Sequence, residues 1–268
     1  MRKNAWVICC CTAVLAAFGT FFRWLQDQVC FEAETGLAVR GSIWPYAVAL
    51  MIVIAAVVLA VVCFRMKNQP HTSFPDSLPA AFAAAPRVRT IGGIVLGALL
   101  AVGGAWLMIS SGTLSSPGLQ RVLAVLAIVT GAAFARQMLA PGDAEATSGA
   151  VVCASMPIVL LAFWLIVSYK VNIINPTISA YAVEILALCA ALIAFYQLAG
   201  FAYGRPKAIK SIFWSQFAAF LCITALPDDR AGAQQLMLAA IAGILVFQSY
   251  LTASNIRPAV SGPVGGAQ

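Results

Sequence analysis

Eight long apolar stretches divide this chain, and they constrain its fold more than any other feature. A helix that crosses the roughly 30 Å hydrocarbon core of a bilayer needs about 20 mostly apolar residues, and each stretch approaches that length. Their approximate bounds are 5–24, 43–64, 90–110, 119–138, 150–169, 178–202, 211–226 and 232–252. The seventh is the shortest and most polar. The pattern predicts an all-α protein, a polytopic transmembrane helical bundle of eight spans in a single integral membrane domain over residues 1–268.

Composition excludes the other broad classes of protein. The 268 residues are 62% hydrophobic and only 9% charged, whereas soluble domains are about 45–50% apolar and about 25% charged. Disordered chains are poor in hydrophobic residues and rich in charge. No stretch has the alternating pattern of an outer-membrane strand. The first expected partner is therefore the lipid bilayer.

The basic residues indicate how the spans are oriented. With a cytoplasmic N-terminus, 11 of the 16 basic residues lie inside, and the five outside are Arg23, Arg40, Arg121, Lys170 and Arg230. Lysine and arginine resist translocation, so both termini are predicted to be cytoplasmic. The net charge of +7 is dispersed, which does not indicate nucleic-acid binding. The first span could also be a signal peptide, but its apolar run continues to Trp24, which favours a retained anchor.

Two segments outside the spans have distinctive compositions. The Pro-rich cytoplasmic loop 65–89 is expected to be mostly irregular, with a short Ala-rich helix within 76–85. The Gly- and Pro-containing segment 253–268 is expected to be a flexible tail. The second and sixth spans open on the same Tyr-Ala-Val triplet, which leaves open a duplication into two parallel four-helix halves.

Small residues recur every fourth position in the third and fourth spans. These residues are Gly93, Gly97, Ala101 and Ala105, and Ala127, Gly131 and Ala135. Such seams let helix backbones approach closely in a membrane. Because the link 111–118 is short, we expect a tight antiparallel hairpin, with a homodimer seam as the alternative.

Glu184 is the only acidic residue inside a predicted span. It lies about 9 Å outward of the centre of its helix, and a charge at that depth is costly enough to suggest a functional site. Tyr181, one turn earlier, could donate a hydrogen bond to it, and Arg121 is the candidate ion-pair partner. Glu184 could bind a proton or cation, or it could form a structural ion pair that fixes helix register.

The last three spans also carry polar residues in their cytoplasmic halves. Four of these, predicted as possible lining of a polar cavity, are Gln197, Ser215, Gln216 and Gln248. Side chains of this kind also commonly bridge helices in membranes.

Several chemistries have no signature in the sequence. The single histidine, His71, lies in the Pro-rich loop, and seven of the eight cysteines lie inside spans without metal-ligand spacing, so no metal site is predicted. There is no Gly-rich phosphate-binding motif and hence no nucleotide site. We expect no cofactor and no enzymatic activity.

Two groups of motifs resemble a family of multi-pass membrane proteins from Clostridia-type, often gut-dwelling, bacteria. They are Trp24-Leu25-Gln26 with 31–37 and Gly41-Ser42, and Asn175-Pro176 with Tyr181, 184–188 and 199–206. The resemblance covers about a third of the chain. It implies a bacterial cytoplasmic (inner) membrane location, and it supplies no activity because the family is uncharacterised.

Three functions are compatible with these features. The first is a small transporter or permease, or a transport-associated protein, in which Glu184 couples to a proton or cation. The second is a non-enzymatic subunit or scaffold that contacts a protein partner, or a second copy, through loop 65–89 and its helix faces. The third is a sensor that uses the outer segment 25–42.

Overall fold

Almost all of the described chain is helical, because a backbone in lipid must satisfy its hydrogen bonds internally. The computed structural model describes residues 2–30, 42–68, 72–83, 86–114, 116–139, 148–172, 178–228 and 230–258. The long helices are α1 (Arg2–Val29), α2 (Trp44–Lys67), α4 (Pro86–Ser110), α5 (Pro117–Leu139), α6 (Ser148–Asn172), α7 (Ile178–Ala202), α8 (Ala208–Thr224) and α9 (Gly232–Ser254). The short elements are α3 (Leu78–Ala81), the 3-10 turn η1 (Ser111–Thr113), and the strands β1 (Thr72–Ser73) and β2 (Arg257–Pro258). The all-α prediction is confirmed.

Seven of the long helices in the described residues are long and apolar enough to cross a membrane. The exception is α8, which has 17 residues and would extend about 26 Å. It coincides with the predicted span 211–226, and most of its side chains are buried inside the bundle. The first helix runs to Val29 instead of ending near Trp24, because its polar last turns are held by partners described below.

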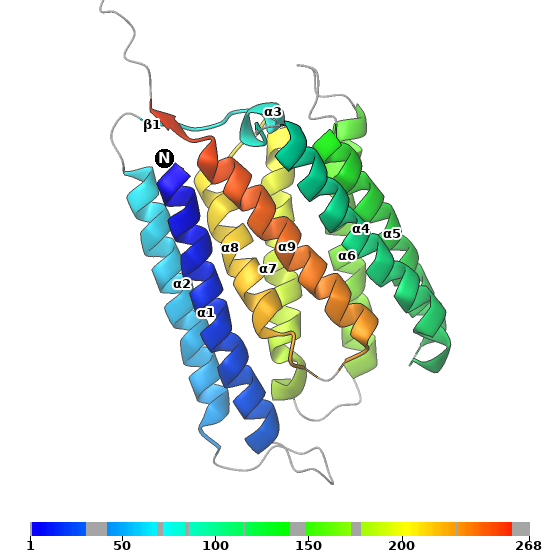
Figure 1. The fold of residues 1–268 in the computed structure, drawn as a ribbon. Helices are drawn as coiled ribbons and strands as arrows, with labels where there is room; N and C mark the ends of the chain where they lie inside the picture. The colour runs from blue at the N-terminus through cyan, green and yellow to red at the C-terminus, as the bar shows by residue number, and fades with distance from the viewer. Residues whose placement is uncertain are drawn as a thin grey trace, which may run out of the picture.

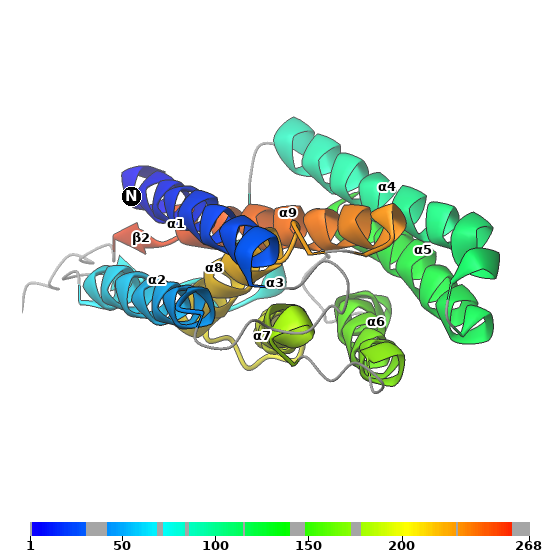
Figure 2. The same ribbon diagram turned by 90° about the horizontal axis from the view of Figure 1, so that it is seen from below.

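Helices α8 and α9 lie between two outer groups (Figures 1 and 2). Helices α1 and α2 contact α8 on one side, whereas α4 and α5 lie on the other side and contact α9 and α6. The first four predicted spans are thus split between the two outer groups, and a duplication into two parallel four-helix halves stays a prediction.

The α4–α5 hairpin is held by direct backbone contact. A Cβ atom built on Gly97 would lie 2.5 Å from the carbonyl oxygen of Gly131, and one on Gly104 would lie 2.8 Å from that of Ala124. The predicted seam is confirmed as packing within one chain, which leaves it covered and not available as a homodimer seam. Gly104 takes the place predicted for Ala105, which is exposed, because two helical turns from Gly97 end near residue 104.

The beginning and the end of the described chain lie at the same end of the bundle, the upper end in Figure 1, which we call the terminal end. There the rings of Trp6 and Tyr250 meet edge to face at 5.6 Å. Strand β1 pairs with β2, and the Asn255 side chain donates to the carbonyl of Ala81 at 2.9 Å. Residues 253–258 are thus structured, contrary to the predicted flexible tail, because they contact loop 65–89; residues 259–268 and His71 lie outside the described residues.

Candidate functional site

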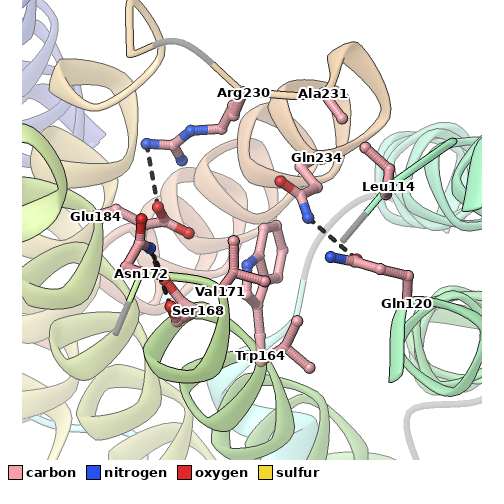
Figure 3. Close-up of a pocket in the computed structure, with 11 residues that line it drawn as sticks. Leu114, Gln120, Trp164, Ser168, Val171, Asn172, Glu184, Arg230, Ala231 and Gln234 are labelled. Carbon is pink, nitrogen blue, oxygen red and sulfur yellow. Dashed lines mark hydrogen bonds and ion pairs between the residues drawn. The ribbon is translucent and has the colours of Figure 1, made fainter. Parts of the chain in front are cut away.

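A pocket of about 170 Å³ lies at the opposite end of the bundle, between α5, α6, α7 and α9 (Figure 3). It is partly open to the surroundings. Its lining residues are Leu114, Gln120, Trp164, Val167, Ser168, Val171, Asn172, Glu184, Arg230, Ala231 and Gln234. Of the residues singled out from the sequence, only Glu184 is among them.

Glu184 enters the pocket from the second turn of α7, and its partner is Arg230, in the connection between α8 and α9. The Arg230 Nη2 atom lies 3.6 Å from Glu184 Oε2 but only 2.7 Å from Asp228 Oδ2. The guanidinium is therefore hydrogen-bonded to Asp228, while its contact with Glu184 is longer than a hydrogen bond.

The predicted partner Arg121 is not part of this site. It lies on the exposed face of α5, where its Nε donates to Ser111 Oγ at 3.3 Å. Tyr181, predicted to assist Glu184, lies one turn before it on α7 but does not line the pocket. The ion pair between Glu184 and Arg121 was not found because the α8–α9 connection brings Arg230 next to Glu184 on α7. Sequence spacing does not show this tertiary arrangement.

A charge network links Glu184 to the first helix. Arg23, on α1, is 1% exposed and donates from Nε to Asp228 Oδ1 at 2.5 Å and from Nη1 to Gln26 Oε1 at 3.0 Å. The Asp27 Oδ1 atom lies 3.8 Å from Arg23 Nη2. Asp228 accepts from Arg23 and Arg230 on its two oxygens, so one carboxylate joins α1 to the loop before α9.

Sequence reasoning missed this network because Arg23 and Arg230 were assigned to outer loops. One local signal for it was present. Arg23 and Asp27 are spaced i, i+4, which places them on one face if α1 continues past its apolar run.

The neutral polar residues of the pocket are mutually ordered. Gln234 Nε2 donates to Gln120 Oε1 at 3.1 Å and so joins α9 to α5. Asn172 Nδ2 donates to the carbonyl of Ser168 at 2.9 Å, within the last turn of α6. Trp164, two turns further into the bundle on α6, lies at the inner limit of the pocket and is 1% exposed.

The four residues predicted to line a polar cavity lie elsewhere. Ser215, Gln216 and Gln248 are buried and Gln197 is half-buried, but none lines this pocket. Gln216 Nε2 donates to Ser249 Oγ at 3.0 Å and contacts Cys9 Sγ at 3.4 Å. These contacts join α8 to α9 and to α1, so Gln216 bridges helices at an interface.

A second, small cavity of about 10 Å³ lies deeper in the bundle. Its lining includes Thr130 of α5, Leu160 and Leu161 of α6, Phe195 of α7 and Ile241 of α9. These are the four helices that form the outer pocket, and Leu160 and Leu161 come one turn before Trp164. The apolar cavity therefore lies further along the same helices than the polar pocket, on the inner side of the Trp164 position.

Among the residues that the structure describes, no group of three or more His, Cys, Asp or Glu side chains is placed to hold a metal ion. The chain matches no protein-family model, and comparisons with curated proteins and with solved structures give no match. The function is therefore argued from the site alone.

Proposed function

We propose that this protein is a small membrane carrier that admits a polar solute into the pocket between α5, α6, α7 and α9. The observation that carries the proposal is a pocket between membrane-spanning helices with the loosely paired carboxylate of Glu184 in its wall. A carboxylate at such a position is expensive in lipid and is typical of substrate and ion pathways.

The pocket and the deeper cavity lie along the same helices. From Glu184 to Phe195, α7 advances 11 residues, or about 16 Å towards the middle of the bundle. The deeper cavity, at about 10 Å³, is too small for a solute, so the carrier proposal requires these helices to move apart during transport. Most of the segment proposed for a sensor lies outside the described residues, since 31–41 is not described.

We also infer that the terminal end faces the cytoplasm of a bacterium, so that the pocket opens outward. Basic residues favour the terminal end, and two of those assigned to the outer side, Arg23 and Arg230, are buried and paired with carboxylates. The excess of water-facing basic residues at the cytoplasmic end is therefore larger than the count from the sequence implies. On this assignment α8 is an eighth, shortened crossing.

Cysteine labelling in intact cells tests this orientation. Gly112, in η1, and Asp76, before α3, are both exposed at opposite ends of the bundle. We expect a membrane-impermeant maleimide to label Gly112→Cys but not Asp76→Cys, with the wild-type chain as the blank for its native cysteines. Labelling of Asp76→Cys alone would reverse the orientation.

Uptake into liposomes tests the carrier proposal. Purified protein is reconstituted and given an external mixture of amino acids, organic ammonium ions, carboxylic acids and sugars, and the internal solutes are measured by mass spectrometry. We expect at least one solute to accumulate and Glu184→Gln to lower its initial uptake rate about tenfold, equivalent to ~1.4 kcal/mol. Asp76→Asn, the matched loss of an exposed carboxylate, should leave uptake unchanged. No accumulation of any solute would rule out a carrier for these classes and favour the sensor or subunit alternatives.

A further inference from the structure

Two charged side chains line the described part of the pocket, and the more exposed of the two is the carboxylate of Glu184. Glu184 has a side chain that is 12% exposed, whereas those of Arg230 and Asp228 are 6% exposed. The Nε and Nη1 atoms of Arg230 are buried and have no hydrogen-bond partner among the described residues. Because these donors are buried, a ligand that enters the pocket would meet the more exposed Glu184 carboxylate before it could reach them.

The charge balance of the network leads to the same conclusion. Among the described residues, the network contains two arginines, Arg23 and Arg230, and three carboxylates, those of Asp27, Asp228 and Glu184. The carboxylate that lines the pocket is that of Glu184, and its contact with Arg230 exceeds hydrogen-bond range. Lys170, the basic residue in the last turn of α6, is exposed and does not line the pocket. Among the residues that the structure describes, the network therefore carries one more negative than positive charge.

The neutral groups of the pocket also suit a cation. Asn172 uses its Nδ2 hydrogens on Ser168, and Figure 3 shows its amide beside the carboxylate of Glu184, so its carbonyl oxygen is left as an acceptor. Trp164 forms the inner wall, and an indole face attracts cations most strongly where water is excluded. Carboxylate, amide oxygen and aromatic face are the three groups that recognise an ammonium ion.

Volume limits the size of the cation. A cavity of about 150 Å³ holds a molecule as large as benzene, and this pocket measures about 170 Å³. A bare metal ion would leave most of the space unfilled, and among the described residues no metal-ligand group is present. We propose that the pocket binds a small organic ammonium cation, with its nitrogen between Glu184 and the face of Trp164. Binding of this cation does not depend on the proposed function; only its transport across the membrane rests on that proposal.

Equilibrium dialysis with radiolabelled choline tests the proposal. The purified protein is held in phosphatidylglycerol nanodiscs, which lack ammonium headgroups, and empty nanodiscs give the background. We expect choline to bind and to be displaced by tetramethylammonium or ethanolamine. Dimethylbutanol, the neutral isostere with carbon in place of nitrogen, and dimethylbutanoate, an anion of similar size, should each compete at least about tenfold more weakly.

Variants locate the binding in the pocket. Glu184→Gln and Trp164→Leu should each weaken choline binding about tenfold, whereas Trp164→Phe should retain most of it. Asp76→Asn is the control, and the melting temperature of each variant shows whether the fold is kept. The dialysis is repeated in phosphatidylcholine nanodiscs, whose headgroups carry the same ammonium group. If free choline binds in phosphatidylglycerol but not in phosphatidylcholine, the headgroup occupies the pocket, and the natural ligand is the ammonium group of a lipid.

Two outcomes separate this inference from the carrier proposal. If no ammonium probe binds, or if dimethylbutanol competes as well as tetramethylammonium, the cation assignment is wrong even where the liposomes accumulate a neutral solute. If choline binds but no solute accumulates in liposomes, the cation site stands and the carrier proposal fails.

Discussion

Replacing Asp228 with asparagine is expected to lower the free energy of unfolding by about 3 kcal/mol, because it removes the shared partner of two buried arginines. Arg23 and Arg230 would each lose their shortest ion pair, and Arg23 is 1% exposed. Breaking a buried pair leaves a charge without compensation, which costs more than the pair itself contributes. Unfolding of the purified protein by sodium dodecyl sulfate, followed by circular dichroism, measures the change.

The double variant Arg23→Met with Asp228→Leu is the informative comparison for this prediction. It removes Arg23 together with Asp228, so that Arg230 is the one buried arginine of the pair that loses its shortest ion pair, and it should be closer to the wild type in stability than Asp228→Asn alone. Asp76→Asn controls for the loss of an acidic group at an exposed position. A change below about 1 kcal/mol for Asp228→Asn, within the range of exposed ion pairs, would mean that water reaches the network and that it does not fix α1.

The substitution Gly131→Ala is expected to separate α4 from α5 and to cost about 3 kcal/mol, at the upper end of the usual range for overpacking. The added Cβ would meet the backbone of α4 at Gly97 and, at 3.0 Å, the amide nitrogen of Ala101. Backbone atoms cannot rotate aside as a flexible side chain can. The same unfolding measurement applies.

Gly118→Ala is the matched control for Gly131→Ala, because it lies on the same helix and nothing in the structure comes within 4 Å of an added Cβ. Alanine is the better helix former, so this variant should be neutral or slightly more stable. Equal stability of Gly131→Ala and Gly118→Ala would show that the hairpin can open at no cost, and the close backbone packing would then not determine its geometry.

The spans were predictable because hydropathy is a local property of the chain. Each predicted stretch corresponds to a helix, and the Gly97 and Gly131 seam followed from four-residue spacing alone. Helix ends were less predictable where polar side chains continue the helix. Arg23 lies at the end of the apolar run of α1, and Gln26 and Asp27 lie beyond it; this segment stays helical because Arg23 binds Asp228, which is far away in the sequence.

The site was only half predictable. The cost of a carboxylate within a span identified Glu184, but not its partner, because Arg121 and Arg230 are both basic residues of the same predicted surface. Only the path of the α8–α9 connection decides between them. The neutral lining, such as the Gln120–Gln234 pair, lies at helix ends where polar residues are ordinary and carry no sequence signal.

The pairing of Arg23 with Asp228 has a consequence for biosynthesis. The two residues are 205 positions apart, and at a synthesis rate of about 5–20 residues per second the partner follows about 10–40 s later. During that interval the polar end of α1 has no Asp228 to bind, and its arginine must remain near the water at the membrane surface. Helix α1 therefore reaches its final depth only after the connection between α8 and α9 has been synthesised.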